Sequence, residues 1–231
     1  MIERYSITST PQQLTERFSV DIPEFYKPRY NAAPGQLLPV ILLYSKGVSF
    51  FYWGESPKWI KDKSISEKWI NVRAEQINEK PIFQKSLKKQ RCLILCDGFY
   101  VWKRVSKKSL VPYRLALKSR APFSIPGFWE EYEDENGESA HTFTLITIRA
   151  HQSLQPIAER IPVLFNLKKE KRWMDANSTE QELLSLMQSE TAEQLDYYSV
   201  EPRINSIAID DKSLILPAPP ADQFGNLTLF D

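Results

Sequence analysis

The sequence is constrained most by a succession of short apolar runs that end at turn-forming residues. Residues 91–96 form one such run, Asp97-Gly98 follows as a turn signal, and a second run covers residues 99–103. Short runs rich in β-branched and aromatic residues, bounded by Gly, Asp or Pro, are typical of β-strands. The same pattern predicts strands at 37–44, 48–53, 113–117, 123–128, 142–148 and 197–200. The chain is therefore expected to be rich in strands.

Helical spacing of apolar residues is less common. It is found at residues 10–18, 73–79, 81–89, 167–174 and 179–187. Thr8 or Ser9 is the expected N-cap of the first helix, because Ser and Thr oxygens accept from free N–H groups there. Asn136-Gly137 predicts a hairpin turn. We expect these helices to flank the strands.

The composition fits one folded domain. Hydrophobic residues make up 42% of the 231 residues, enough for one sizeable core, and no repeat or long linker divides the chain. We expect a single β-rich α+β domain over residues 1–216, followed by a Pro-rich tail over residues 217–231. No signal peptide opens the chain and no apolar run approaches the ~20 residues of a membrane span. A cytoplasmic location without membrane contact is expected.

The two cysteines indicate core packing rather than chemistry. Cys92 and Cys96 lie within the predicted strand 91–96. In a reducing compartment such residues are expected to be buried free thiols. The chain holds only two His, and a zinc site would need more ligands. We therefore expect no metal and no cofactor.

The charge balance excludes a protein that is basic overall. Thirty Lys and Arg residues face 29 Asp and Glu residues, for a net charge of +1. Contact with nucleic acid would therefore depend on local positive clusters. Three clusters are present, and each could equally be a solvated face. They are Lys58, Lys61, Lys63 and Lys68; Lys85, Lys88, Lys89 and Arg91; and Lys103, Arg104, Lys107 and Lys108.

Several short motifs occur in one order over residues 1–206. They are Arg29-Tyr30-Asn31 with Ala33-Pro34-Gly35; Trp53-Gly54 with Pro57 and Trp59; Ile70-Asn71-Val72-Arg73-Ala74-Glu75; Arg91-Cys92-Leu93-Ile94 with Asp97-Gly98-Phe99-Tyr100 and Trp102-Lys103; Gly127, Trp129 and Glu130; Thr144 to Thr147; and Arg160 with Pro162. Each motif alone is weak, but their order is specific. The sequence resembles the SRAP family, the SOS-response-associated peptidase domains that bind abasic single-stranded DNA. The resemblance implies one α+β domain of mostly antiparallel strands, with a groove for single-stranded DNA.

The resemblance also implies a reaction. In the family, a cysteine at position 2 becomes the N-terminal residue, and its amine condenses with the aldehyde of an abasic sugar. Its thiol then closes a thiazolidine ring, which leaves a stable DNA–protein crosslink. An Asn positions the sugar, and a Glu and a His handle protons. The family name refers to a proposed self-processing peptidase built from the same cysteine.

This sequence departs from the family pattern at three decisive positions. Ile2 stands where the cysteine is expected and has no thiol. Val101 replaces the expected Glu and Ala158 the expected His, and neither side chain can hold or donate a proton. We therefore expect no thiazolidine crosslink. Because the bulky Ile2 disfavours removal of Met1, the alternatives for residual chemistry are the Met1 amine and His151.

The polar residues that the resemblance assigns to DNA are largely kept. Guanidinium groups suit phosphate oxygens, and indole rings stack on unpaired bases. The expected DNA-binding residues are Arg4, Asn31, Pro34, Trp53, Asn71, Arg73, Glu75, Trp102 and Arg160. Trp59 is an alternative to Trp53. A structural alternative remains open for each, since Arg73 and Glu75 could form an internal ion pair and the tryptophans could fill the core.

The tail carries a separate signal. Asn226-Leu227-Thr228-Leu229-Phe230 resembles the short Gln-Leu-Ser/Asp-Leu-Phe peptides that dock on bacterial sliding clamps. It follows a Pro-rich spacer, where a tethered ligand would sit. We expect clamp binding through Asn226, Leu227, Leu229 and Phe230. The alternative is a tail that packs back onto the domain.

Three functional hypotheses follow. The first is a SRAP protein without catalysis that binds single-stranded or abasic DNA in the DNA damage (SOS) response. The second is an active SRAP enzyme with rearranged chemistry, and the third is a protein-interaction module that has lost DNA binding. The kept residues Arg4, Asn71, Arg73 and Arg160 favour the first over the third. The absent Cys, Glu and His favour the first over the second.

Overall fold

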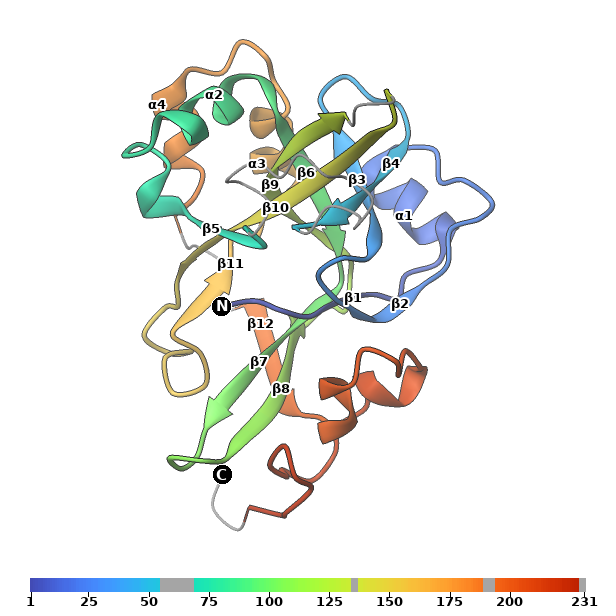
Figure 1. Cartoon of the computed structure of the whole chain (residues 1–231), viewed down its shortest axis with the longest axis vertical. Helices are drawn as coiled ribbons and strands as arrows, with labels where there is room; N and C mark the ends of the chain where they lie inside the picture. Colours follow the sequence, from blue (N-terminus) through green and yellow to red (C-terminus); the bar gives the residue numbers. More distant parts are fainter. Residues whose placement is uncertain (55–68, 134–136, 189–193, 229–231) are drawn as a thin grey trace.

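The chain forms two β-sheets with short helices at their periphery (Figure 1). The structure, a computed structural model, describes residues 1–54, 69–133, 137–188 and 194–228. One large hydrophobic core takes residues from both sheets, from Ile2 near the start of the chain to Leu195 near its end. The two sheets therefore belong to one folded unit.

The larger sheet closes on itself. Its strands are β3 (Leu37–Leu42), β4 (Val48–Trp53), β5 (Asn71–Arg73), β6 (Arg91–Cys96), β9 (Phe123–Glu133), β10 (Ser139–Arg149) and β11 (Arg160–Pro162). Six of them follow the order β11-β10-β4-β3-β6-β9, and β9 also pairs with β10. β10 runs parallel to β4 and β5, whereas its pairs with β9 and β11 are antiparallel. This closed sheet encloses most of the core.

The smaller sheet carries the site described below. Its order is β12-β8-β7-β1-β2, with every pair antiparallel. The strands are β1 (Tyr5–Ile7), β2 (Arg29–Ala32), β7 (Gly98–Arg104), β8 (Leu110–Leu117) and β12 (Leu195–Ser199). β7 and β8 form a hairpin that extends to the lower end of the molecule in Figure 1. Its tip lies well away from the closed sheet.

The helices are short and lie outside the sheets. They are α1 (Pro11–Phe18), α2 (Pro81–Lys89), α3 (Leu167–Trp173) and α4 (Glu180–Ser185), with the 3-10 turns η2 (Ala74–Gln76), η4 (Pro202–Asn205) and η5 (Lys212–Ile215). α2 packs on β6 and β9 of the larger sheet. η4 and η5 contribute Ile204 and Leu214 to a second cluster with Tyr100 and Val200. The predicted α+β class, with mostly antiparallel strands and flanking helices, is confirmed. None of the described helices is long and apolar enough to cross a membrane.

A buried ion pair holds the N-terminal strand β1 in place. Oδ1 of Asp97 accepts from Nη2 of Arg114 at 3.1 Å and from the hydroxyl of Ser6 at 2.7 Å. Its Oδ2 accepts from the backbone N–H groups of Thr8 and Ser9. A Cβ at Gly98 would lie 2.5 Å from the guanidinium of Arg114, so only glycine leaves room for this pair. The turn at Asp97-Gly98 is therefore also the anchor of β1.

Three local expectations differ from the structure. The N-cap of α1 is Thr10, which forms a capping box with Gln13, while the N–H groups of Thr8 and Ser9 are taken by Asp97. Residues 73–79 form a strand end and one 3-10 turn rather than a helix, because residues 71–73 pair with β10. Residues 29–32, where the sequence pattern predicts no strand, are β2. The predicted hairpin turn falls partly on Asn136, which lies outside the described residues.

Candidate nucleic-acid interface

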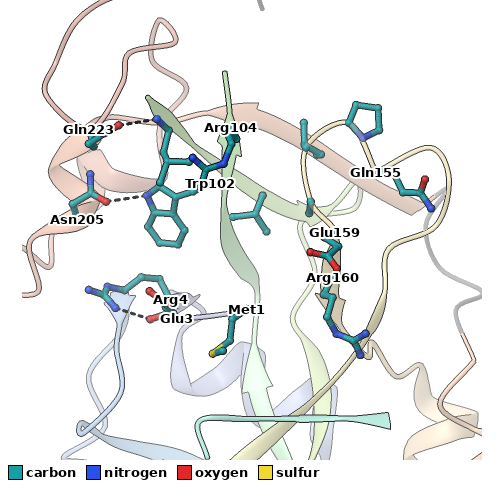
Figure 2. Close-up of a pocket in the computed structure, with 15 residues that line it drawn as sticks. Met1, Glu3, Arg4, Trp102, Arg104, Gln155, Glu159, Arg160, Asn205 and Gln223 are labelled. Atoms are coloured by element: carbon teal, nitrogen blue, oxygen red, sulfur yellow. Dashed lines mark hydrogen bonds between the residues drawn. The ribbon is translucent and has the colours of Figure 1, made fainter. Parts of the chain in front are cut away.

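A cleft of about 1010 Å³ lies where the two ends of the chain meet the β7–β8 hairpin. Figure 2 shows residues from the N-terminal segment, β7, the loop before β11, η4 and the tail around one space. The lining residues are Met1, Glu3, Arg4, Val101, Trp102, Arg104, Leu110, Gln155, Pro156, Ile157, Ala158, Glu159, Arg160, Asn205 and Gln223. Arg4, Trp102 and Arg160 were expected at such a site from the sequence, and the structure brings these three together.

Two of the three replaced positions line this cleft. Val101 lies on β7 and Ala158 precedes β11, and both are buried at the cleft wall. Ile2 does not line the cleft, because its side chain is fully buried in the core. Met1 is 76% exposed and does line it. The cleft lining therefore carries methyl groups at two positions where the family resemblance leads us to expect proton-carrying groups.

Arg160 is held by protein groups on the cleft wall. Its Nη2 donates to Oε2 of Glu75 at 2.7 Å and to the carbonyl oxygen of Thr147 at 2.8 Å. The Arg160 side chain is only 10% exposed, whereas that of Glu75 is 50% exposed. Burial raises the pKa of Glu75, but the hydrogen bonds and the charge of Arg160, together with backbone hydrogen bonds, outweigh this effect and hold that pKa below its usual value. The guanidinium is thus oriented before any ligand arrives.

Asn71 ties the N-terminal segment to the larger sheet. Its Nδ2 donates to the carbonyl oxygen of Ile2 at 2.7 Å, and its Oδ1 is buried with no hydrogen-bond partner among the described residues. Arg4 is half-buried, with Nη1 donating to the Glu3 carbonyl oxygen at 2.7 Å and Nε without a partner. Arg73 is exposed at the end of β5 and is not a lining residue. Asn71 therefore acts on the cleft through the segment that carries Met1 and Arg4.

The sequence matches the family described as SOS response associated peptidase (SRAP) over residues 1–207. The chain belongs to the SRAP family. It is 35% identical over 221 residues to the abasic site processing protein YoqW of Bacillus subtilis, covering 93% of this chain and 99% of that protein. It is 34% identical to YoaM, another abasic site processing protein of B. subtilis, covering 89% of this chain and 93% of that one.

The fold of this SRAP protein also matches solved structures. A crystal structure of a protein from Bacteroides thetaiotaomicron superposes with a TM-score of 0.82 and covers 93% of this chain and 99% of that one. The two sequences are 22% identical, so the likeness concerns the fold alone. It supports the two-sheet architecture.

Trp102 faces the cleft in a fixed orientation. Its indole N–H donates to Oδ1 of Asn205 at 2.9 Å (Figure 2). The side chain is half-buried, so part of the ring surface stays open to a ligand. Asn205 is in turn positioned by η4. The stacking residue expected from the sequence is therefore available.

The structure removes Trp53 and Asn31 from the interface. Trp53 is fully buried between Tyr5 and Phe143, and its indole N–H donates to the Ile70 carbonyl oxygen at 2.9 Å. It cannot stack on a base from this position. Trp59 lies outside the described residues.

Asn31 has a structural role instead. It is fully buried, and its Nδ2 donates to the carbonyl oxygens of Ile204, Ser206 and Ile209. It shapes the turn that carries Asn205. Pro34 is half-buried in the turn between β2 and β3 and does not line the cleft. Both residues therefore act as scaffold.

Several lining residues were not predicted as site residues from the sequence, among them Arg104, Asn205 and Gln223. Arg104 had been noted only as part of a basic cluster, and no signal marked Asn205 or Gln223. Oε1 of Gln223 accepts from the Leu110 N–H at 2.7 Å, and its Nε2 donates to the Lys108 carbonyl oxygen at 2.6 Å. Only the tertiary fold shows that the tail reaches the cleft.

The described part of the tail packs on the β7–β8 hairpin. Asp222 is buried and accepts from the N–H groups of Phe224 and Asn226 and from the hydroxyl of Ser109. Leu227 is 69% exposed. Leu229 and Phe230 lie outside the described residues. The segment that resembles clamp-binding peptides, residues 226–230, therefore begins at the end of a turn that is fixed to the domain.

The two cysteines and His151 lie away from the cleft lining. Cys92 and Cys96 are free and fully buried, and burial raises the pKa of both thiols. His151 is exposed, with Nδ1 2.9 Å from the Ser153 hydroxyl, and does not line the cleft. Across residues 1–54, 69–133, 137–188 and 194–228, no group of three or more His, Cys, Asp or Glu side chains could hold a metal ion.

Proposed function

We propose that this SRAP protein binds single-stranded DNA in its cleft, in the abasic-site setting that the names of its relatives indicate, without forming a covalent crosslink. The observation that carries the proposal is the composition of the cleft. Arg4, Trp102 and Arg160 line it, while Val101 and Ala158 occupy the proton-carrying positions of the family pattern. We place this activity in the DNA damage (SOS) response and in the cytoplasm.

The cleft has the parts that a non-covalent interface needs. Arginine forks bind phosphate oxygens, and base stacking on an indole is worth about 1–3 kcal/mol per base. Arg4 and Arg104 supply positive charge beside the fixed indole of Trp102. Because the net charge of the chain is only +1, affinity depends on these local groups. Binding is expected to weaken as salt rises, since counterion release drives phosphate contacts.

The same cleft lacks the parts that the family crosslink needs. Ile2 has no thiol, and the two thiols of the chain are buried in β6. Val101 and Ala158 cannot move protons. Any imine that an amine forms with an aldehyde would therefore stay reversible, because no thiol is present to close a ring.

The test is a gel assay with abasic and intact single-stranded DNA, run native and denaturing in parallel. We expect a native shift with both strands and no band that survives heat and detergent. Arg4→Ala should weaken the shift about tenfold, because it removes a phosphate-binding fork. Arg120→Ala, which removes a surface arginine paired with Asp196, is the matched control and should leave the shift unchanged. A heat-stable adduct, or no shift at all, would contradict the proposal.

The tail suggests a second partner. We propose that residues 226–230 dock on a sliding clamp, supported by their resemblance to clamp-binding peptides and by the 69% exposure of Leu227. Deletion of residues 226–231 should abolish binding to a purified bacterial clamp. The control is Leu216→Ala, a change at another exposed leucine, which should leave clamp binding intact. Equal binding by the deletion variant, or none by the full chain, would remove the proposal.

A further inference from the structure

We propose that the nucleotide held against the cleft wall carries its base, so that the protein prefers intact single-stranded DNA over the same strand with an abasic site at that position. This inference rests on the proposed function of the cleft and names its ligand more closely.

Part of the cleft lining is apolar. Val101, Ile157 and Ala158 line it, and each is less than 10% exposed. Leu110, half-buried, also lines the cleft. None of these side chains has a polar atom. A ligand group that reaches this wall finds no side-chain hydrogen-bond partner on it.

The wall is also rigid. Val101 is paired with Tyr113 in the β7–β8 ladder. The N–H groups of Ile157 and Ala158 donate to the Leu154 carbonyl oxygen at 3.0 and 2.9 Å. Both halves of the apolar wall are therefore held by backbone hydrogen bonds, and the surface exists before a ligand binds.

Such a wall discriminates between a base and a bare sugar. The hydroxyl and aldehyde oxygens of an abasic sugar lose water at an apolar surface and gain no partner, which costs free energy. The flat face of a nucleobase loses little hydration and gains hydrophobic and dispersion contacts there. The wall that replaces the proton-carrying residues of the family pattern therefore suits a base better than an abasic sugar.

The rim of the cleft complements a complete nucleotide. Arg4 and Arg104 offer charge for phosphates, while Glu159 and Asn205 offer groups for the polar edge of a base. In Figure 2 these side chains stand around the space on different sides. The volume of about 1010 Å³ lies at the upper end of the ~300–1,000 Å³ found for small-molecule sites. A nucleotide with its neighbouring phosphates fits this space.

The first experiment compares two oligonucleotides that differ only in the central nucleotide. One has thymidine there and the other a tetrahydrofuran residue, which lacks both base and aldehyde. Fluorescence anisotropy at one fixed salt concentration gives both dissociation constants. We expect the intact strand to bind about tenfold tighter, or ~1.4 kcal/mol. Equal or tighter binding of the tetrahydrofuran strand overturns this inference but leaves the proposed function standing, whereas no binding of either strand overturns both.

The second experiment places a larger side chain in the space that we propose for the base. Ala158→Leu should weaken binding of the intact strand about tenfold and that of the tetrahydrofuran strand less than about twofold, because only the base needs the space. Ala176→Leu, the same change at an exposed position between α3 and α4, is the control. An equal loss for both strands would overturn the inference. Should Ala158→Leu fail to fold, Val101→Ala provides the same comparison by removing apolar contacts from the wall.

Discussion

The indole N–H of Trp102 donates a hydrogen bond to Oδ1 of Asn205, with 2.9 Å between nitrogen and oxygen. These residues are 103 positions apart in the chain. Asn205 ends η4, and the turn that follows is held by Asn31 through the carbonyl oxygens of Ser206 and Ile209. The orientation of Trp102 at the cleft therefore depends on two distant segments, which are η4 with the turn after it and β2.

Removing the acceptor should loosen the stacking residue. We expect Asn205→Ala to weaken binding of single-stranded DNA about threefold to tenfold, and Trp102→Ala to weaken it by the ~1–3 kcal/mol of a stacked base. Anisotropy titrations measure both losses. Asn177→Ala, at an exposed position between α3 and α4, should stay within about twofold of the parent. If Asn205→Ala behaved like this control, the hydrogen bond would have no role in binding.

The pair of Glu75 and Arg160 should give a pH-dependent contribution to stability. The folded-state pKa of Glu75 is lowered, so its stabilising effect is present above the unfolded pKa and is lost as pH falls through the lower folded value. At pH 7 we expect Glu75→Gln to cost about 0.5 kcal/mol, since Glu75 is half exposed and screened. Thermal unfolding from pH 7 to 3 should show this difference shrinking below about pH 4. A difference that stays constant across this range would assign the effect to packing rather than charge.

We expect the buried ion pair of Asp97 and Arg114 to contribute most of the stability that holds β1 in place. Asp97→Ala leaves a guanidinium that is 6% exposed without its carboxylate, which costs about 3–5 kcal/mol for a buried pair. Because one kcal/mol shifts the melting temperature of a domain of this size by about 2–4 °C, a loss near 10 °C is expected. Asp196→Ala, which breaks a half-exposed pair with Arg120, should cost less than about 1 kcal/mol. Equal losses for the two variants would mean that burial adds nothing at Asp97.

We expect the two thiols to be unreactive in the folded protein. Burial raises the pKa of Cys92 and Cys96, so little reactive thiolate forms and no reagent reaches it. At pH 8 we expect a colorimetric thiol reagent to label neither residue in the native state and both in denaturant. Rapid native labelling would show that β6 opens, or that a thiol is available for chemistry at the cleft.

Local patterning predicted the strands that have a strong apolar run. The bounds of β4 and β6 and of α2 agree with the expected segments 48–53, 91–96 and 81–89. β1 escaped detection because it has three residues and is held by Asp97, about ninety positions away. β2 escaped for a similar reason, since Asp210 accepts from the N–H groups of Tyr30 and Asn31. Strands fixed by distant side chains leave no periodic signal.

The site was predicted in part, through residue types rather than positions in space. Arg4, Val101, Trp102, Ala158 and Arg160 followed from the family pattern, and all line the cleft. A pattern of residue types carries no information about burial. Trp53 and Asn31 were therefore predicted to bind DNA, although both are fully buried. Residues such as Asn205 and Gln223 reach the cleft only through the packing of η4 and the tail.

The contacts around the cleft also determine how late during synthesis the protein can finish folding. Arg4 shares the cleft with Gln223, which lies far downstream in the sequence. The hydrogen bond from Ser6 to Asp97, which holds β1 in place, cannot form until Asp97, 91 residues later, has been synthesised. Contacts between such distant positions form late, and the apolar surface of Ile2 and Tyr5 stays uncovered until then. A nascent chain therefore exposes apolar surface until residue 97 has been synthesised, and a translation product that stops short of residue 223 lacks part of the cleft.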